Sequence, residues 1–153
     1  MSEIDVLAGE ALVADWRDLL ARHAAAACAL DRELGELHGL GMSEFEVLER
    51  LAEDEDAACD RLLRVQELAA MVHLSQSALS RLIGRLEKAG LVTRKMCELD
   101  RRGIYVTLTG DGRRRYEEAR PLHREVLART LAAPSGNPPG AVAPPRPEPA
   151  APC

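Results

Sequence analysis

The chain has 153 residues, enough for one domain with a sizeable core. Hydrophobic residues make up 46% but aromatic residues only 3%, so Leu, Ala and Val must build that core, which favours helices. No apolar run approaches the ~20 residues that cross a bilayer, and no basic start precedes an apolar stretch, so we expect a cytoplasmic protein without a membrane partner.

The first predicted element is a long helix over about residues 5–37. Its apolar stripe recurs at three- and four-residue steps and comprises Leu12, Trp16, Leu19, Leu20, His23, Ala27, Leu30, Leu34 and Leu37. A helix of this length outgrows the core of a small domain, so part of the stripe should meet another chain. We therefore expect residues 1–40 to form a dimerisation helix.

A second helix is predicted to begin at Ser43, after Gly39 and Gly41 end the first. Ser43 and Glu46 have the spacing of a capping box, in which a Ser and a Glu three residues apart satisfy the free N–H groups at a helix start. The acidic residues 53–60 that follow are predicted to form an exposed loop.

Residues 65–108 have the pattern of two short helices followed by two strands. The first helix spans about residues 65–72, and a break at His73 separates it from a second helix that Ser75 caps and Gly90 ends. Two β-like runs follow at 91–96 and 104–108, joined by a charged turn.

The last predicted helix runs from about residue 111 to 131, capped by Thr109 and mildly interrupted at Pro121. We expect a winged helix-turn-helix domain over 41–109 and a C-terminal dimerisation helix over 110–133. The Pro-, Gly- and Ala-rich residues 134–153 cannot bury a core and are expected to be disordered. The predicted fold is mainly α with a small β-wing.

The second helix of the helix-turn-helix has the side chains of a DNA-reading helix. If Leu79, Leu82 and Ile83 face the core, the opposite face is polar and lacks acidic residues up to Arg85. Gln can read adenine and Arg guanine through paired hydrogen bonds, while Ser bonds to bases or phosphates. The predicted DNA-binding residues of this helix are Ser75, Gln76, Ser77, Ser80, Arg81 and Arg85.

The turn between the strands carries Arg101 and Arg102, which could enter the minor groove with Asp100 holding one of them. The net charge of −5 does not oppose this interpretation, because charge is segregated along the chain. Residues 43–60 hold eight acidic side chains, whereas residues 81–102 hold seven Arg or Lys. One basic surface on an acidic protein is therefore expected.

Residues 65–112 resemble the winged-helix core of the multiple antibiotic resistance regulator (MarR) family. The matching motifs are ELA before the turn, LSQSALSRLIGRLEKAGLV through the second helix, and DRRG followed by VTLTGDG. Upstream, GLGMSEFEVLERLAE is similar to the family's second helix, and the whole resemblance extends over about residues 5–131.

The resemblance implies a homodimeric transcriptional regulator, usually a repressor, that binds a pseudo-palindromic site on double-stranded DNA. It places Arg85 at the backbone and Arg101 or Arg102 in the minor groove. The residues that it places at bases and nearby phosphates are Ser75, Gln76, Ser77, Ser80 and Arg81. The helical part ends near Leu131, so the family's final dimerisation helix is expected to be shortened or merged.

The resemblance also implies that a small phenolic or lipophilic effector releases the regulator from DNA. Trp16 and His23 lie on one stripe of the first helix and could line an effector crevice, although a lone Trp and His on an apolar stripe more often serve core or interface packing. Cys28, Cys59, Cys97 and Cys153 lack close pairing and are expected to be free thiols. Cys97 lies among basic residues that favour its thiolate, which makes it a candidate redox sensor.

Two alternatives stay open beside a ligand-released repressor. A redox- or metal-responsive regulator would use the same fold, although His23, His38, His73 and His123 show no close ligand spacing. A winged-helix module that binds a protein instead of DNA should show apolar or acidic residues over 76–85. No phosphate-binding Gly loop or catalytic motif is present, so we expect neither an enzyme nor a cofactor.

Overall fold

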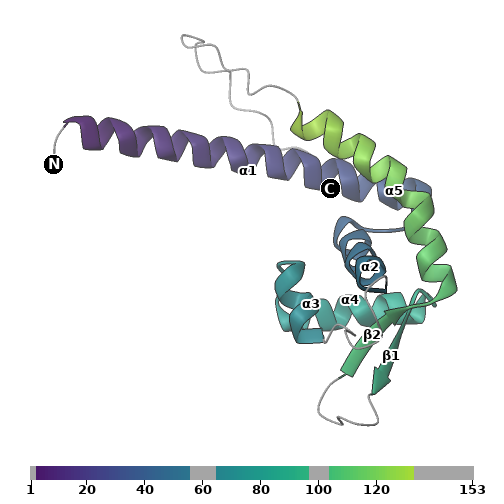
Figure 1. The fold of residues 1–153 in the computed structure, drawn as a ribbon. Coiled ribbons are helices and arrows are strands. Elements are labelled where there is room, and N and C mark those ends of the chain that lie inside the picture. Colours follow the sequence, from purple (N-terminus) through teal and green to yellow (C-terminus); the bar gives the residue numbers. More distant parts are fainter. Residues whose placement is uncertain (1–2, 56–64, 97–103, 133–153) are drawn as a thin grey trace.

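The computed structural model describes residues 3–55, 65–96 and 104–132, and these form a helical protein with a two-stranded wing. Helix α1 (Glu3–His38) packs against α5 (Gly110–Leu131), which lies over its C-terminal part (Figure 1). Figure 1 shows the N-terminal half of α1 projecting away from the other elements. The expected class, mainly α with a small β-wing, is confirmed.

Helix α2 (Met42–Glu55) begins one residue earlier than the sequence predicted and is capped differently. Asp31 accepts a hydrogen bond from the backbone N–H of Met42 at 2.7 Å, and Glu44 accepts one from that of Gly41 at 3.0 Å. The predicted capping box of Ser43 and Glu46 is therefore wrong. Helix α2 also includes residues 53–55, so the predicted loop was wrong there, and its remainder lies outside the described residues.

Helices α3 (Val65–Met71) and α4 (Gln76–Lys88) form the expected helix-turn-helix. The turn closes with His73 in the left-handed region at φ 54°, which matches the predicted break. The Ser75 hydroxyl accepts a hydrogen bond from the N–H of Ala78 at 3.2 Å, as an N-cap should. Gly90, at φ 76°, follows the end of α4, so both predicted limits are confirmed.

Strands β1 (Val92–Met96) and β2 (Ile104–Leu108) pair antiparallel, with Val92 opposite Leu108 and Met96 opposite Ile104. Thr109 caps α5 as predicted, since its hydroxyl accepts from the N–H of Gly112 at 3.0 Å. Helix α5 is continuous through Pro121, and its axis bends partway along its length (Figure 1). A bend without a break is the usual consequence of proline inside a helix.

The core lies where α2, α3, α4 and the wing meet the C-terminal half of α1 and the inner face of α5. Phe45 lies fully buried at its centre, stacked on His123 with ring centroids 4.1 Å apart. Other fully buried side chains include those of Leu34, Leu48, Leu68, Leu79, Ile83 and Val126. Within the described ranges, no helix combines the length and apolarity needed to cross a membrane.

Candidate nucleic-acid interface and internal pocket

The outer face of α4 presents every residue that the sequence assigned to it. Leu79, Leu82, Ile83 and Leu86 are buried against the core, which fixes the rotation of the helix. The exposed side is formed by Ser75, Gln76, Ser77, Ser80, Arg81 and Arg85. Arg81 makes no ion pair with another described residue, so its guanidinium is available to a ligand. Over residues 75–85 the helix therefore offers a strip of hydrogen-bonding side chains without an acidic residue, and the one acidic residue of α4, Glu87, follows in its last turn.

Arg85 and a neighbouring arginine on the wing are held by acidic side chains. Arg85 donates through Nε to Glu44 of α2 at 3.2 Å. Arg94 of β1 lies 3.7 Å from Glu87 and donates to the carbonyl of Ser80 at 3.5 Å. Arg94 thus joins the base of the wing to α4, a role that sequence reasoning did not assign to it.

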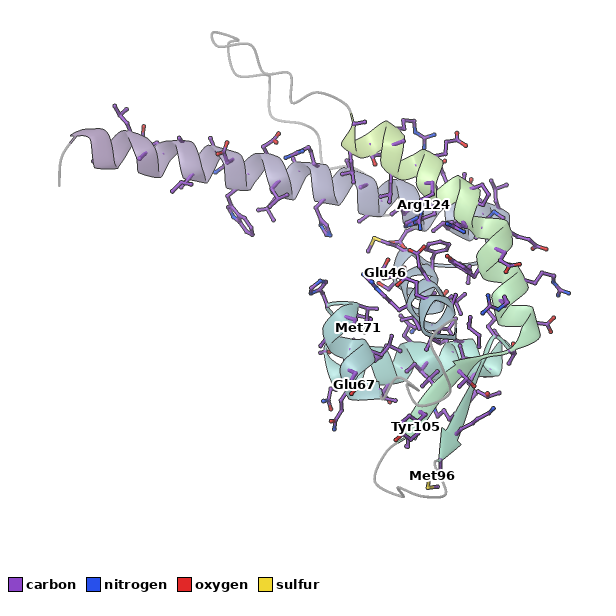
Figure 2. All side chains as sticks on the ribbon, in the orientation of Figure 1. Glu46, Glu67, Met71, Met96, Tyr105 and Arg124 are labelled. Carbon is purple, nitrogen blue, oxygen red and sulfur yellow. The ribbon has the colours of Figure 1, made fainter. Side chains whose placement is uncertain are left out.

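The structure does not describe the tip of the wing, residues 97–103. Arg101, Arg102, Asp100 and Cys97 lie outside the described residues, so the predictions made for them stay predictions. Figure 2 shows Met96 at the outer end of β1. The side chain of Lys95, the preceding residue, is exposed.

A second feature is a cavity of about 350 Å³ where α1, α2 and α5 meet. Its wall is mainly apolar and is formed by Leu19, Arg22, His23, Ala26, Ala27, Leu30, Met42, Glu46, His123, Leu127 and Leu131. The structure places His23 on this wall. Trp16, 57% exposed, does not line the cavity, so the structure does not bring the two predicted effector residues together there.

A polar cluster adjoins this cavity through His123, which lines its wall. Arg124 of α5 reaches the carboxylate of Glu49 on α2, and the Tyr116 hydroxyl donates to the same carboxylate at 3.2 Å. Arg124 also lies 2.7 Å from Nδ1 of His123. Because arginine can only donate, Nδ1 must be the acceptor, so neutral His123 carries its proton on Nε2. Figure 2 shows Arg124 and Glu46 at the junction of α2 and α5.

The electrostatics of the cluster favour an ionised Glu49 and a neutral His123. Burial opposes ionisation of Glu49, but the hydrogen bonds and charge of Arg124 outweigh it and hold the pKa of this carboxyl below its usual value. Burial and the positive charge of Arg124 lower the pKa of His123, against the opposing effect of Glu49. Burial and Glu49 raise the pKa of Tyr116.

The described part of the chain bears on two expectations, that the cysteines are free thiols and that the regulator could respond to a metal ion. Cys28 is disulfide-bonded, so the expectation of a free thiol is wrong for this residue. Cys59, Cys97 and Cys153 lie outside the described residues, so the expectation made for them stays a prediction. No cluster of three or more His, Cys, Asp or Glu side chains that could hold a metal ion occurs in the described ranges.

Sequence reasoning missed His123 as a cavity residue, although a signal was present. Tyr116, Ala119, His123 and Val126 are spaced by three or four residues, which places them on one face of α5, and all four are buried. That spacing could have marked His123 as an inward-facing histidine. Its partners on α2 could not have been identified, because they are more than seventy residues away in sequence.

Comparison with known proteins places this geometry in a family context. Residues 38–103 match the model described as the MarR family. The chain is similar to Sco3205 of Streptomyces coelicolor, solved as a MarR family transcriptional regulator in complex with DNA. The two are 32% identical with a TM-score of 0.70, and the match covers 82% of this chain and 77% of that one.

Two further relatives are more distant or shorter matches. CouR of Rhodococcus jostii RHA1, solved bound to p-coumaroyl-CoA, is 26% identical over 75% of this chain and 77% of that one, with a TM-score of 0.63. The transcriptional regulator FarR of Neisseria gonorrhoeae is 41% identical over 56 residues, or 37% of this chain. That match spans only 38% of FarR.

Proposed function

The chain belongs to the MarR family, and from this premise we propose that it is a homodimeric, sequence-specific DNA-binding transcriptional regulator released by a small molecule. The observation that carries the proposal is the outer face of α4. Over residues 75–85 it combines Gln76, Ser80 and Arg81 with no acidic residue, on a helix whose rotation is fixed by four buried apolar residues. These side chains form the hydrogen bonds that read bases in the major groove.

Homodimerisation is supported by the N-terminal half of α1. Its exposed apolar side chains are those of Val6, Leu7, Leu12, Val13, Trp16, Leu19 and Leu20. All of these except Leu7 share one face of the helix, and an apolar surface of this kind marks an interaction site in a protein that stays in solution. A second copy is the partner that fits, because a two-fold dimer would place two α4 helices for the two halves of a pseudo-palindromic site.

The effector site is proposed to be the cavity between α1, α2 and α5. Its size is in the range of small-molecule sites, and its wall is apolar with a few polar groups. A lipophilic or phenolic molecule would fit that chemistry, and CouR is a relative solved with an aromatic acyl thioester bound. Occupation of the cavity could shift α5 relative to α2, and with it the spacing of the two winged domains.

Titration of the full-length protein with a fluorescein-labelled random-sequence duplex, at low and at moderate salt, tests the proposal. We expect binding at low salt whose affinity falls steeply with salt, because each phosphate contact releases counterions. A winged-helix module that binds a protein partner would leave the duplex unbound even at low salt, and that result would refute the proposed function.

A further inference from the structure

Arg85, near the end of α4, is linked to the start of another helix. Its Nε donates to Oε1 of Glu44 at 3.2 Å, across 41 positions of sequence. The second carboxylate oxygen of Glu44 accepts a hydrogen bond from the backbone N–H of Gly41 at 3.0 Å. A single carboxylate therefore connects the first turn of α2 with the helix that carries the candidate DNA-binding residues.

Within this pair, Glu44 is the fixed member and Arg85 the outer one. The Glu44 side chain is 19% exposed, whereas that of Arg85 is 64% exposed. Glu44 is held by its contact with Gly41 and by the favourable field at the start of a helix. The Nη1 and Nη2 atoms of Arg85 make no hydrogen bond to a carboxylate in the described part of the chain. The terminal donors of the arginine thus face solvent while its Nε is held.

We propose that Glu44 is a positioning residue for DNA binding, which holds Arg85 through Nε so that its terminal nitrogens meet a DNA phosphate. This inference rests on the proposed DNA-binding function. A guanidinium that is already held loses less side-chain freedom when it binds, and its remaining N–H groups suit the geometry of a phosphate.

The charge of Glu44 could also oppose DNA binding, and an experiment can distinguish this electrostatic effect from the positioning of Arg85. A carboxylate close to DNA also repels phosphate, so Glu44 could act only as a negative charge that weakens binding. Repulsion would act on the DNA whatever residue occupies position 85. Positioning requires the arginine itself, so the two effects differ in whether a substitution of Glu44 depends on Arg85.

The experiment is a double-mutant cycle of full-length protein with E44Q, R85A and the double variant. Affinity for a fluorescein-labelled random-sequence duplex is measured by anisotropy over a salt series. We expect R85A to weaken binding about tenfold, the effect of one charge-assisted contact. The slope of log affinity against log salt should fall by about 0.9. E44Q should weaken binding about threefold alone and not at all in the R85A background.

Two further variants control for folding and for charge. D31N changes the other carboxylate that caps α2, at Met42, without touching Arg85, and should bind DNA like the wild type. R85K keeps a positive charge but lacks the fork of nitrogens, so it should bind more weakly than the wild type. Binding of R85K at wild-type strength would show that the held geometry is unnecessary.

Three other results would overturn the proposal. E44Q could leave binding unchanged, could strengthen it equally with and without Arg85, or could weaken it no more than D31N does. A wild-type protein that does not bind the duplex at low salt would instead refute the proposed function. The failure of the positioning role and the failure of DNA binding are therefore distinguishable.

Discussion

Large apolar side chains are buried in the winged domain but exposed on the N-terminal half of α1. In the winged domain, Phe45, Leu79 and Ile83 are fully buried by other parts of this chain. On α1, Leu12 is 69% and Trp16 57% exposed. Figure 1 shows why, since no other helix or strand of the described ranges packs on that half of the helix. The winged domain is therefore complete within one chain, whereas α1 requires a second surface.

This difference has an energetic meaning. Complete burial of a Leu or Val side chain stabilises the buried state by about 1.5–3 kcal/mol. A row of exposed apolar side chains does not contribute this free energy to the single chain. In the winged domain the free energy of apolar burial stabilises the fold of the monomer. On α1 the same free energy would be gained only when another surface covers the helix. Substitutions in the first region should thus change unfolding, and substitutions in the second should change assembly.

The largest effect on the self-contained region is expected for Gly112→Ala. A Cβ at this position would lie 2.0 Å from the carbonyl oxygen of Leu91, which also accepts a hydrogen bond from the N–H of Thr109. Backbone atoms cannot yield to this overlap, so α5 must move away from the wing. We expect a loss of at least about 3 kcal/mol in the free energy of unfolding, measured by urea denaturation.

Gly110→Ala is the matched control for that substitution. A Cβ at Gly110 has no other atom within 4 Å, so the same chemical change two residues away should leave stability within about 1 kcal/mol of the wild type. Equal stability of the two variants would contradict the close packing of α5 on Leu91.

The exposed region is tested by Leu12→Asp. Leu12 is already exposed in the single chain, so monomer stability should change little. In a dimer, two copies of the side chain would lose burial, and we expect dissociation to become at least about 100-fold easier. Sedimentation over a range of concentrations measures the dissociation constant.

Ala14→Asp is the corresponding control on α1. Ala14 is exposed and lies on the opposite side of a helix with 3.6 residues per turn, so it carries the same new charge away from the stripe. It should leave assembly as in the wild type. A Leu12→Asp protein that sediments like the wild type would exclude the stripe as the dimer interface.

A more gradual effect is expected at the cavity between the two regions. The pKa of buried His123 is lowered below its ordinary 6.5 by burial and by Arg124. Below pH 6.5 the unfolded chain binds a proton that the folded chain does not, so stability should fall as the pH drops toward the folded pKa and then level off. Urea denaturation between pH 7.5 and 5.5 measures this slope, and H123Q should reduce it. An undiminished slope in H123Q would assign the effect to other groups.

Local signals in the sequence were sufficient for the helix-turn-helix. Ser75 and Gly90 mark the limits of α4 because capping depends on residues next to the helix end. The start of α2 was mispredicted because one of its caps, Asp31, lies eleven positions from its partner Met42. The Ser43 and Glu46 spacing was a plausible local pattern, but a contact from α1 determines the actual helix start.

In the candidate sites too, local features could be predicted from the sequence, whereas contacts between distant residues could not. The exposed face of α4 followed from helical periodicity once its buried side was identified. The cluster of Glu49, Tyr116 and Arg124 joins α2 to α5, so only the folded chain brings it together. The link between Glu44 and Arg85 likewise depends on how α2 packs beside α4. Local periodicity therefore predicts which side of a helix is exposed, but not the residue that holds a side chain there.

The most direct test of the central claim, that α4 reads DNA, is the affinity of Arg81→Ala for duplexes enriched from a random pool by the wild-type protein. Arg81 is exposed on α4 without an ion-pair partner among the described residues. If it reads a base, the substitution should weaken binding by about 1–3 kcal/mol. Arg17→Ala, an exposed arginine on α1, should bind like the wild type. Wild-type affinity in Arg81→Ala would contradict the placement of α4 in the major groove.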